Sequence, residues 1–319
     1  MRRRVPPAPR ARCRGLVLIV VLWGVVLLTL LATAFSFSLR TEARLTSALI
    51  ERARAGAAAE AGVHRLMATL AGTDRRRFDA LDAHMRFDGM DVVLRMEPEN
   101  ARIDLNAAPA ALLEGLVRRA AAGLAEDIDA VAVVDAILDW RDTDSVPRPR
   151  GAEAGDYEAE GRAMRPRNSA LLSVSELSRV RGVSPGLYQA LAPLVTVYAW
   201  SPRVDALSAS REVLLAVPGL DEASVQAFLA QRREDANPRR AMTLLAGAER
   251  YVASAGSGVF SLAAHASGAG GVNVSRRAVV KRTGNSTRPV SVLAWFEDAA
   301  AALPAPGDQT PPPGSDEAN

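Results

Sequence analysis

The sequence predicts an α+β fold in which a long N-terminal helix packs on a small antiparallel sheet and a large helical domain is inserted between the strands. Three observations lead to this prediction. An uncharged apolar run extends from Leu16 to Leu39, and no proline occurs between Leu16 and Gly72, so one helix can continue through the whole segment. Alternating apolar residues predict strands near residues 90–105 and again after Gly256. The segment 106–247 between them has helical patterning.

The first fifteen residues differ in charge from the rest of the chain. At 1.5 Å per residue, the run 16–39 forms about 36 Å of helix, enough to cross a hydrocarbon core of ~30 Å. Basic residues ahead of such a span predict a cytoplasmic N-terminus and a body on the opposite side. The border of the apolar run is Gly15, and the basic residues before it are Arg2, Arg3, Arg4, Arg10, Arg12 and Arg14.

Three interpretations of this N-terminal segment are open. The first is an uncleaved anchor, and the second is a secretory signal peptide cut at Ala32-Thr33-Ala34, which has the A-x-A form. The third is cleavage after Gly15, which leaves the apolar helix in the membrane. We favour the third because the helical pattern continues unbroken through Ala34 and because a glycine gives a peptidase close access to the scissile carbonyl.

Cleavage after Gly15 changes the properties of the mature chain. The formal charge falls from +3 to −3, because residues 1–15 contain six arginines and no acid. A mildly acidic mature chain has no global electrostatic reason to bind nucleic acid. The only cysteine, Cys13, lies in the removed segment, so the mature chain forms no disulfide.

The N-terminal helix is expected to continue beyond the membrane and to end near Ala71-Gly72-Thr73-Asp74. Residues 40–105 hold this second half and the first strands. An apolar stripe should pack the helix on the globular body; it consists of Leu45, Leu49, Ala53, Gly56, Val63, Met67 and Leu70.

The inserted domain, 106–247, shows helix signals at several points. Ser173 and Glu176 have capping-box spacing, Ser184-Pro185 starts a helix, and Asp221 caps another. Strands return in 248–298, and the Pro-rich tail 299–319 should be disordered. The expected strands are Met90–Met96, Ile103–Leu105, Val259–Ala266, Val272–Lys281 and Val290–Phe296.

Several motifs resemble one known family. The stretch from Arg14-Gly15-Leu16 through Val20, followed by Leu22-Trp23, resembles a type IV prepilin leader, and specifically that of the K-class minor pseudopilins of type II secretion systems. The segments Ile103–Pro109 and Asp139–Tyr198 resemble the same family. The resemblance implies a type IV pilin-like body with an inserted α-domain. Like that class, the chain lacks the glutamate that most pilins carry at the fifth mature position, here Val20.

The resemblance also implies a function and a set of partners. A prepilin peptidase cuts after Gly15 and methylates the new amine of Leu16. The protein lies in the bacterial inner membrane as a single-pass protein with its C-terminal body in the periplasm. It joins the I-class and J-class minor pseudopilins, the major pseudopilin and the inner-membrane assembly platform. It then initiates and caps the tip of the periplasmic pseudopilus, and no nucleic acid is expected as a partner.

An internal repeat suggests an alternative function. Leu105-x-Ala107 with Leu112-Leu113 matches Leu207-x-Ala209 with Leu214-Leu215 at an offset of 102. Val217-Pro218-Gly219-Leu220 before Asp221 resembles a helix-hairpin-helix or SAM-like unit, and Val180–Val183 forms a similar turn. The alternative is therefore a membrane-anchored helix-hairpin-helix DNA-binding protein for DNA uptake.

The alternative is disfavoured by the residues after the two turns. Asp221 and Ser184 stand where the DNA-binding hairpin usually has a second glycine, and an aspartate repels phosphate. The arginines nearby are better interpreted as a solvated helix face; they are Arg232, Arg233, Arg239 and Arg240.

An acidic loop is a candidate cation site, with Asp142, Asp144, Glu153 and Asp156 as its ligands. It is not an EF-hand, since Pro147 replaces the required glycine. A solvated acidic loop is the other interpretation. The resemblance implies calcium here, although Asp156-Tyr157-Glu158 stands where the family commonly has paired tyrosines.

Catalytic motifs are missing from the sequence. There is no Gly-x-Ser-x-Gly elbow, no His-Glu-x-x-His pair and no phosphate loop, and the histidines (His64, His84 and His265) are scattered. We therefore expect no enzyme and no cofactor other than calcium.

Overall fold

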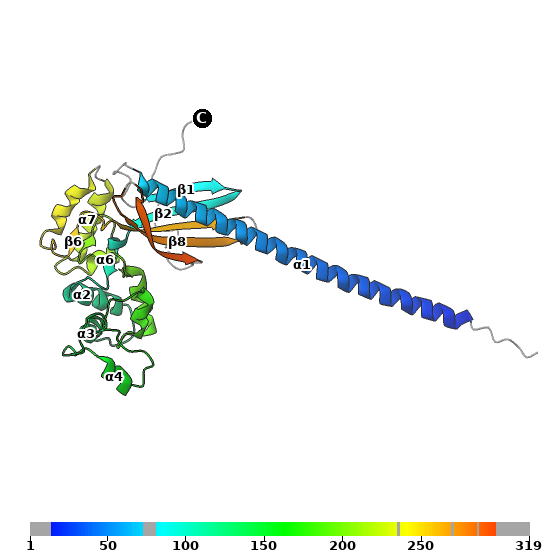
Figure 1. Cartoon of the computed structure of the whole chain (residues 1–319), viewed down its shortest axis with the longest axis horizontal. Helices are drawn as coiled ribbons and strands as arrows, with labels where there is room; N and C mark the ends of the chain where they lie inside the picture. The colour runs from blue at the N-terminus through cyan, green and yellow to red at the C-terminus, as the bar shows by residue number, and fades with distance from the viewer. Residues whose placement is uncertain (1–13, 73–80, 235–236, 269–270, 286, 298–319) are drawn as a thin grey trace, which may run out of the picture. The chain divides into compact units, whose positions relative to one another are not determined.

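The computed structural model describes residues 14–72, 81–234, 237–268, 271–285 and 287–297 (Figure 1). The chain divides into two compact units, residues 1–54 and 55–319. The predicted leader residues 1–13 and the predicted tail 299–319 lie outside the described residues.

The helix α1 (Arg14–Ala71) is a single element of 58 residues, as predicted. It ends where expected, with the N–H of Gly72 donating to the carbonyl of Thr69 at 3.2 Å. Its N-terminal part is long and apolar enough to cross a membrane. Within the first unit, the large apolar side chains from Leu18 to Ile50 are exposed, as those of a lipid-facing or helix-packing segment would be.

The sheet has five antiparallel strands in the order β1-β2-β7-β8-β9. The long insertion therefore separates neighbouring strands β2 and β7, which confirms the predicted α+β arrangement of helix and antiparallel sheet. Strand β1 was not predicted, whereas the other four were. The strands are β1 (Leu81–Phe87), β2 (Met90–Pro98), β7 (Val259–Ser267), β8 (Asn273–Arg282) and β9 (Val290–Glu297).

The second half of α1 packs on this sheet through small residues. At Gly62, an added Cβ would lie 2.6 Å from Leu94 Cδ2 and 2.8 Å from Ala264 Cβ, so the helix approaches the strands too closely for a side chain. The buried helix residues are Ala55, Ala58, Ala59, Val63, Leu66 and Leu70.

The predicted apolar stripe was wrong in its first half. Leu45 and Leu49 are 61% and 69% exposed, and Ala53 is exposed as well, because burial against the sheet begins only at Ala55. Val63 and Leu70 are buried as predicted. The spacing rule identified residues at helical intervals, but exposed leucines of the first unit fitted it as well as buried residues of the second.

Edge strand β9 departs from its predicted alternation. Val292 is 50% exposed, and the ladder with β8 shifts register between Val279 and Val280. Such a bulge turns the side chains of one strand relative to its neighbour, which the sequence of β9 alone does not reveal.

A second apolar core, separate from the helix–sheet core, lies in the inserted segment. Ile103 and Leu105 belong to this second core, and β3 pairs with β4 rather than with the main sheet. The longer elements are α2 (Ala110–Ala121), α3 (Ala130–Arg141), α5 (Pro185–Leu191), α7 (Glu222–Glu234) and η5 (Pro238–Leu245). The shorter ones are η2 (Glu99–Ala101), β3 (Ile103–Asp104), α4 (Ala154–Ala159), η3 (Val174–Arg179), η4 (Ala192–Leu194), β4 (Val195–Thr196), β5 (Val204–Asp205), α6 (Arg211–Leu215) and β6 (Val252–Ala253).

The internal repeat is present in the structure, but its offset is 101 rather than the 102 predicted from the letters. The carbonyl of Asp104 accepts from Ala108 N at 2.8 Å, and that of Asp205 accepts from Ala209 N at 2.9 Å. Each turn follows a short strand in a parallel pair, β3 with β4 and β5 with β6. The backbone turn around each aspartate sets the equivalence, whereas the leucine match was one residue out of register.

An arginine completes each repeat in the same way. Arg141 donates to the carbonyls of Leu105 and Ala108, and Arg232 donates to those of Ala206 and Ala209. Arg232 therefore holds its own domain together instead of lying on a solvated face with the other arginines. Burial is the main cause of the lowered pKa of both guanidinium groups.

The two predicted hairpin turns have similar backbones, with Gly182 at φ +81° and Gly219 at φ +87°. Asp221 caps α7, since its Oδ1 accepts from Ser224 N at 2.8 Å. The capping box at Ser173 was wrong, because Glu176 accepts instead from Leu172 N and Trp140 Nε1. The helix-hairpin-helix and SAM-like assignment stays a prediction.

Candidate functional site

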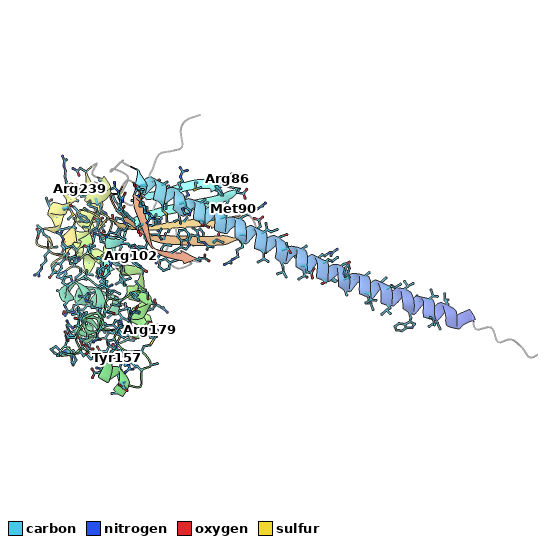
Figure 2. All side chains as sticks on the ribbon, in the orientation of Figure 1. Arg86, Met90, Arg102, Tyr157, Arg179 and Arg239 are labelled. Carbon is cyan, nitrogen blue, oxygen red and sulfur yellow. The ribbon has the colours of Figure 1, made fainter. Side chains whose placement is uncertain are left out.

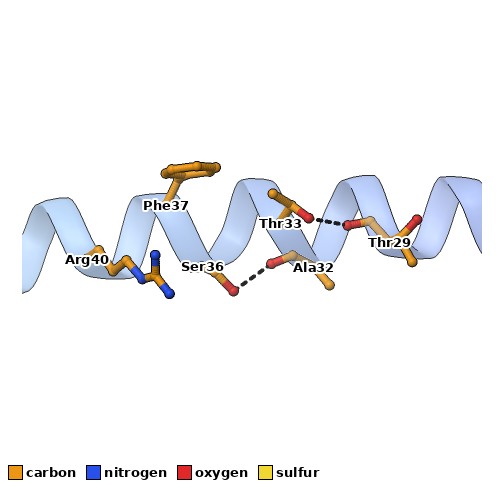
Figure 3. Close-up of a pocket in the computed structure, with 6 residues that line it drawn as sticks. All are labelled: Thr29, Ala32, Thr33, Ser36, Phe37 and Arg40. Carbon is orange, nitrogen blue, oxygen red and sulfur yellow. Dashed lines mark hydrogen bonds between the residues drawn. The ribbon is translucent and has the colours of Figure 1, made fainter.

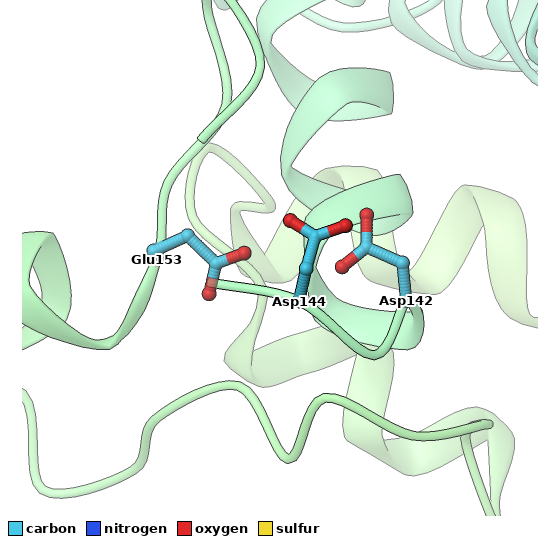
Figure 4. Close-up of side chains that lie close together, drawn as sticks. All are labelled: Asp142, Asp144 and Glu153. Atoms are coloured by element: carbon cyan, nitrogen blue, oxygen red, sulfur yellow. The ribbon is translucent and has the colours of Figure 1, made fainter. Parts of the chain in front are cut away.

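Three of the four predicted ligands lie together. One carboxylate oxygen from each of Asp142, Asp144 and Glu153 lies within 4.8 Å of the others (Figure 4). Asp142 follows the last residue of α3, Asp144 stands two residues later, and Glu153 immediately precedes α4. The C-terminal end of α3 and the N-terminal end of α4 therefore place the three carboxylates of the connecting loop close together.

Asp156 has a different role from the one predicted. Its Oδ2 accepts the backbone N–H of Glu153 at 2.8 Å, so it stabilises the start of α4. Within the described residues, the group of mutually close carboxylates does not include it. Asp156 thus orients Glu153 through the backbone.

Glu153 is the most unusual member of the cluster. Its residue is 5% exposed, and among the described residues neither carboxylate oxygen has a hydrogen bond of normal geometry; the backbone N–H groups at the start of α4 are the nearby donors. Burial raises the pKa of this carboxyl, and the negative charges of Asp139, Asp142 and Asp144 raise it further. Oδ1 of Asp142 is likewise buried without a partner. Buried carboxylate oxygens that lack donors are costly unless a cation or a proton satisfies them.

The chemistry of this donor set fits calcium. All three residues offer carboxylate oxygens, the hard ligands that Ca²⁺ prefers, and the unsatisfied atoms belong to two of them. The loop differs from a solvated acidic surface in that Glu153 is buried.

Two residues that the sequence did not single out shape this loop. Arg148 Nη1 lies 2.5 Å from Asp139 Oδ1 and 2.5 Å from Asp142 Oδ2. Next to it, Gly151 leaves room for the aspartate, since a Cβ there would lie 1.8 Å from Asp139 Oδ2. The sequence Pro-Arg-Pro-Arg-Gly can be read directly from the chain, but only the fold shows that its Arg148 pairs with Asp139 of α3.

Asn168 also shapes the acidic loop, and the sequence analysis did not single it out. Its Nδ2 donates to Ser145 Oγ at 3.0 Å and to the carbonyl of Asp144. Its Oδ1 is buried without a partner among the described residues, and its φ is +51°. Asparagine tolerates this left-handed backbone better than most residues. It joins a distant segment to the acidic loop.

Tyr157, labelled in Figure 2, packs α4 against the core of the inserted domain. The ring is fully buried and meets Trp140 edge to face at 5.6 Å between centroids. Its hydroxyl accepts the N–H of Arg181 at 2.8 Å, and burial raises its pKa. A single tyrosine thus holds the helix that begins directly after Glu153.

Gly15 and Leu16, the predicted cleavage and methylation residues, lie in the first turn of α1. Farther along, a shallow, open pocket on the helix is lined by Thr29, Ala32, Thr33, Ser36, Phe37 and Arg40 (Figure 3). The hydroxyls of Thr33 and Ser36 bond to carbonyls four residues earlier. These polar groups are already satisfied within the helix, and the small side chains allow another helix to approach closely.

A family model, a curated protein and a solved structure are similar to this chain. A family described as type II secretion system (T2SS), protein K, matches residues 96–200. The type II secretion system protein K of Aeromonas hydrophila is 45% identical over 71 residues, which span 22% of this chain and 22% of that protein. In the crystal structure of the GspK–GspI–GspJ complex from enterotoxigenic Escherichia coli, one chain aligns with a TM-score of 0.59 and 18% identity, covering 81% of this chain and 98% of that chain.

Proposed function

The chain belongs to the type II secretion system protein K family, as its motifs predicted, and from this premise we propose that it is a minor pseudopilin that initiates and caps the tip of the periplasmic pseudopilus. The observation that carries the proposal is the long helix α1. Its apolar first part can span a membrane, and its last part packs on an antiparallel sheet. The aligned chain of the Escherichia coli complex has a similar fold, which supports the same arrangement.

Processing on the cytoplasmic side fits this helix. A prepilin peptidase cuts after Gly15 and methylates Leu16, so the membrane-spanning part stays attached to a body in the periplasm. The helix continues without interruption through Ala32-Thr33-Ala34, which supports this site over a signal-peptide cleavage there.

The absence of a carboxylate at the fifth mature position, here Val20, supports a place at the tip of the fibre. A carboxylate at this depth is costly unless it pairs with an amine of a neighbouring subunit. A subunit with no neighbour ahead of it needs no such carboxylate. The insertion between β2 and β7 also adds bulk that would block the addition of further subunits above it.

The partners follow from the same reasoning. The solved Escherichia coli complex contains GspI and GspJ, and we extend that assembly to the I-class and J-class proteins that accompany this chain. The open pocket at Thr29, Thr33 and Ser36 supports parallel packing of membrane helices. The major pseudopilin and the inner-membrane assembly platform would be met during fibre growth.

Calcium is the ligand we assign to Asp142, Asp144 and Glu153. Support comes from the unpartnered oxygens of Glu153 and Asp142 and from the absence of softer donors in the group. A bound divalent ion would hold the ends of α3 and α4 together and so stiffen the inserted domain.

Secretion tests the function. A deletion strain complemented with Gly15→Val should retain full-length precursor in the membrane and lose exported proteins from the culture supernatant. Gly24→Val is the matched control, because an added Cβ at Gly24 meets nothing within 4 Å, and its precursor should be processed. Mature protein that begins at Phe35, or a deletion that abolishes DNA uptake and spares secretion, would overturn the proposal.

A further inference from the structure

Arg148 bridges two carboxylates with one nitrogen. Its Nη1 contacts Asp139 and Asp142 at 2.5 Å each, and its backbone N–H also donates to Asp139 Oδ2 at 3.1 Å. Asp139 is fully buried in α3, so its charge depends on this contact. The side chain of Asp142 remains 22% exposed.

This contact gives the two oxygens of Asp142 different surroundings. Oδ2 accepts a hydrogen bond from the guanidinium, whereas Oδ1 is buried and has no partner in the described part of the chain. The same carboxylate also belongs to the cluster with Asp144 and Glu153. The guanidinium thereby holds one oxygen and leaves the other available to a cation.

Arg148 also limits the repulsion in the loop. Asp139, Asp142, Asp144 and Glu153 carry four negative charges when ionised, and Arg148 is the cation bound among them. An arginine guanidinium stays protonated in proteins, so this positive charge persists beside Asp142. Without it, Asp139 and Asp142 would repel each other and turn apart.

We propose that Arg148 is a positioning residue of the calcium site, which binds no metal itself but fixes Asp142 so that its free oxygen faces Asp144 and Glu153. The inference rests on the calcium site proposed above. Residues that orient metal ligands from outside the coordination sphere commonly affect metal affinity by about 10- to 100-fold.

Calcium titration of the full-length protein in detergent, followed by calorimetry, tests this role. Arg148→Met should weaken calcium binding by about tenfold or more, and Arg148→Lys should recover most of the affinity because one ammonium can also meet two carboxylates. Arg150→Met is the matched control. Arg150 lies in the same loop but pairs with the half-exposed Asp129 at 2.8 Å, and its loss should leave affinity unchanged.

A double variant separates positioning from folding. Asp139→Asn with Arg148→Met removes the buried charge that the single variant would strand, so the protein keeps its fold. Its calcium affinity should still be about tenfold low, because Asp142 has lost its orienting contact. Wild-type affinity in the double variant would overturn the role of Arg148. If the wild-type protein itself fails to bind calcium, the proposed calcium site is wrong instead.

Discussion

The close contact between α1 and the sheet at Gly62 makes a quantitative prediction. In Gly62→Ala the new Cβ would lie 2.6 Å from Leu94 Cδ2, 2.8 Å from Ala264 Cβ and 3.2 Å from Val92 Cγ1. Overpacking of this kind costs about 1–3 kcal/mol. The higher helix propensity of alanine returns up to about 1 kcal/mol. With that gain subtracted in full, the net loss in the free energy of unfolding should be up to about 2 kcal/mol.

Gly56 provides the matched control on the same helix. There an added Cβ meets only Arg276 Nη2, at an ordinary 3.5 Å, so Gly56→Ala should gain up to about 1 kcal/mol. Urea denaturation of both full-length variants in detergent, followed by circular dichroism and linear extrapolation, measures the difference. Equal stability of the two variants would refute the close approach of helix and sheet.

Three further predictions concern the inserted domain. Burial raises the pKa of Asp104 above its ordinary 3.8, so the native state holds the proton more tightly than the unfolded chain does. The stability of wild type relative to Asp104→Asn should therefore be highest below pH 3.8 and fall as the pH rises through the native pKa. Urea titrations at several pH values measure this difference, and the opposite slope would contradict the prediction. Arg232→Met leaves the carbonyls of Ala206 and Ala209 without their donor and should cost about 2–3 kcal/mol in urea titrations, with Arg233→Met, on the exposed side of α7, as the control that should change little. Glu153→Gln removes an unpaired buried charge, so melting temperatures should show no loss of metal-free stability but a reduced rise on adding calcium; an undiminished rise would exclude Glu153 as a ligand.

Local sequence patterns predicted those features that depend on neighbouring residues. A long run without proline was sufficient for α1, and alternation was sufficient for β2, β7 and β8. The three clustered carboxylates could also be named, because acidic residues in one loop are visible in the sequence. Which of them would be buried was not visible, since burial of Glu153 depends on how α3 and α4 pack.

Register errors had a different origin. The repeat was found through leucines at an offset of 102, but the equivalent backbone turns at Asp104 and Asp205 lie 101 residues apart. Leucines at several positions suit an apolar core, whereas only one position supplies the aspartate and backbone N–H groups of the turn. Hydrogen bonding therefore fixes the register more tightly than hydrophobicity does.

By itself, the sequence determined the long apolar N-terminal helix, the glycine at its border, four of the five strands of the main sheet, and the resemblance to the type II secretion system protein K family that matches residues 96–200. These features follow from composition and short-range periodicity, which act within a few residues. Only the tertiary structure decided which face of α1 is buried, that Asp156 serves α4 rather than the carboxylate cluster, and that Arg148 and Asn168 hold the acidic loop. Those outcomes depend on how each element packs against its core, even where the contacting residues, such as Glu153 and Asp156, lie only a few positions apart in the chain.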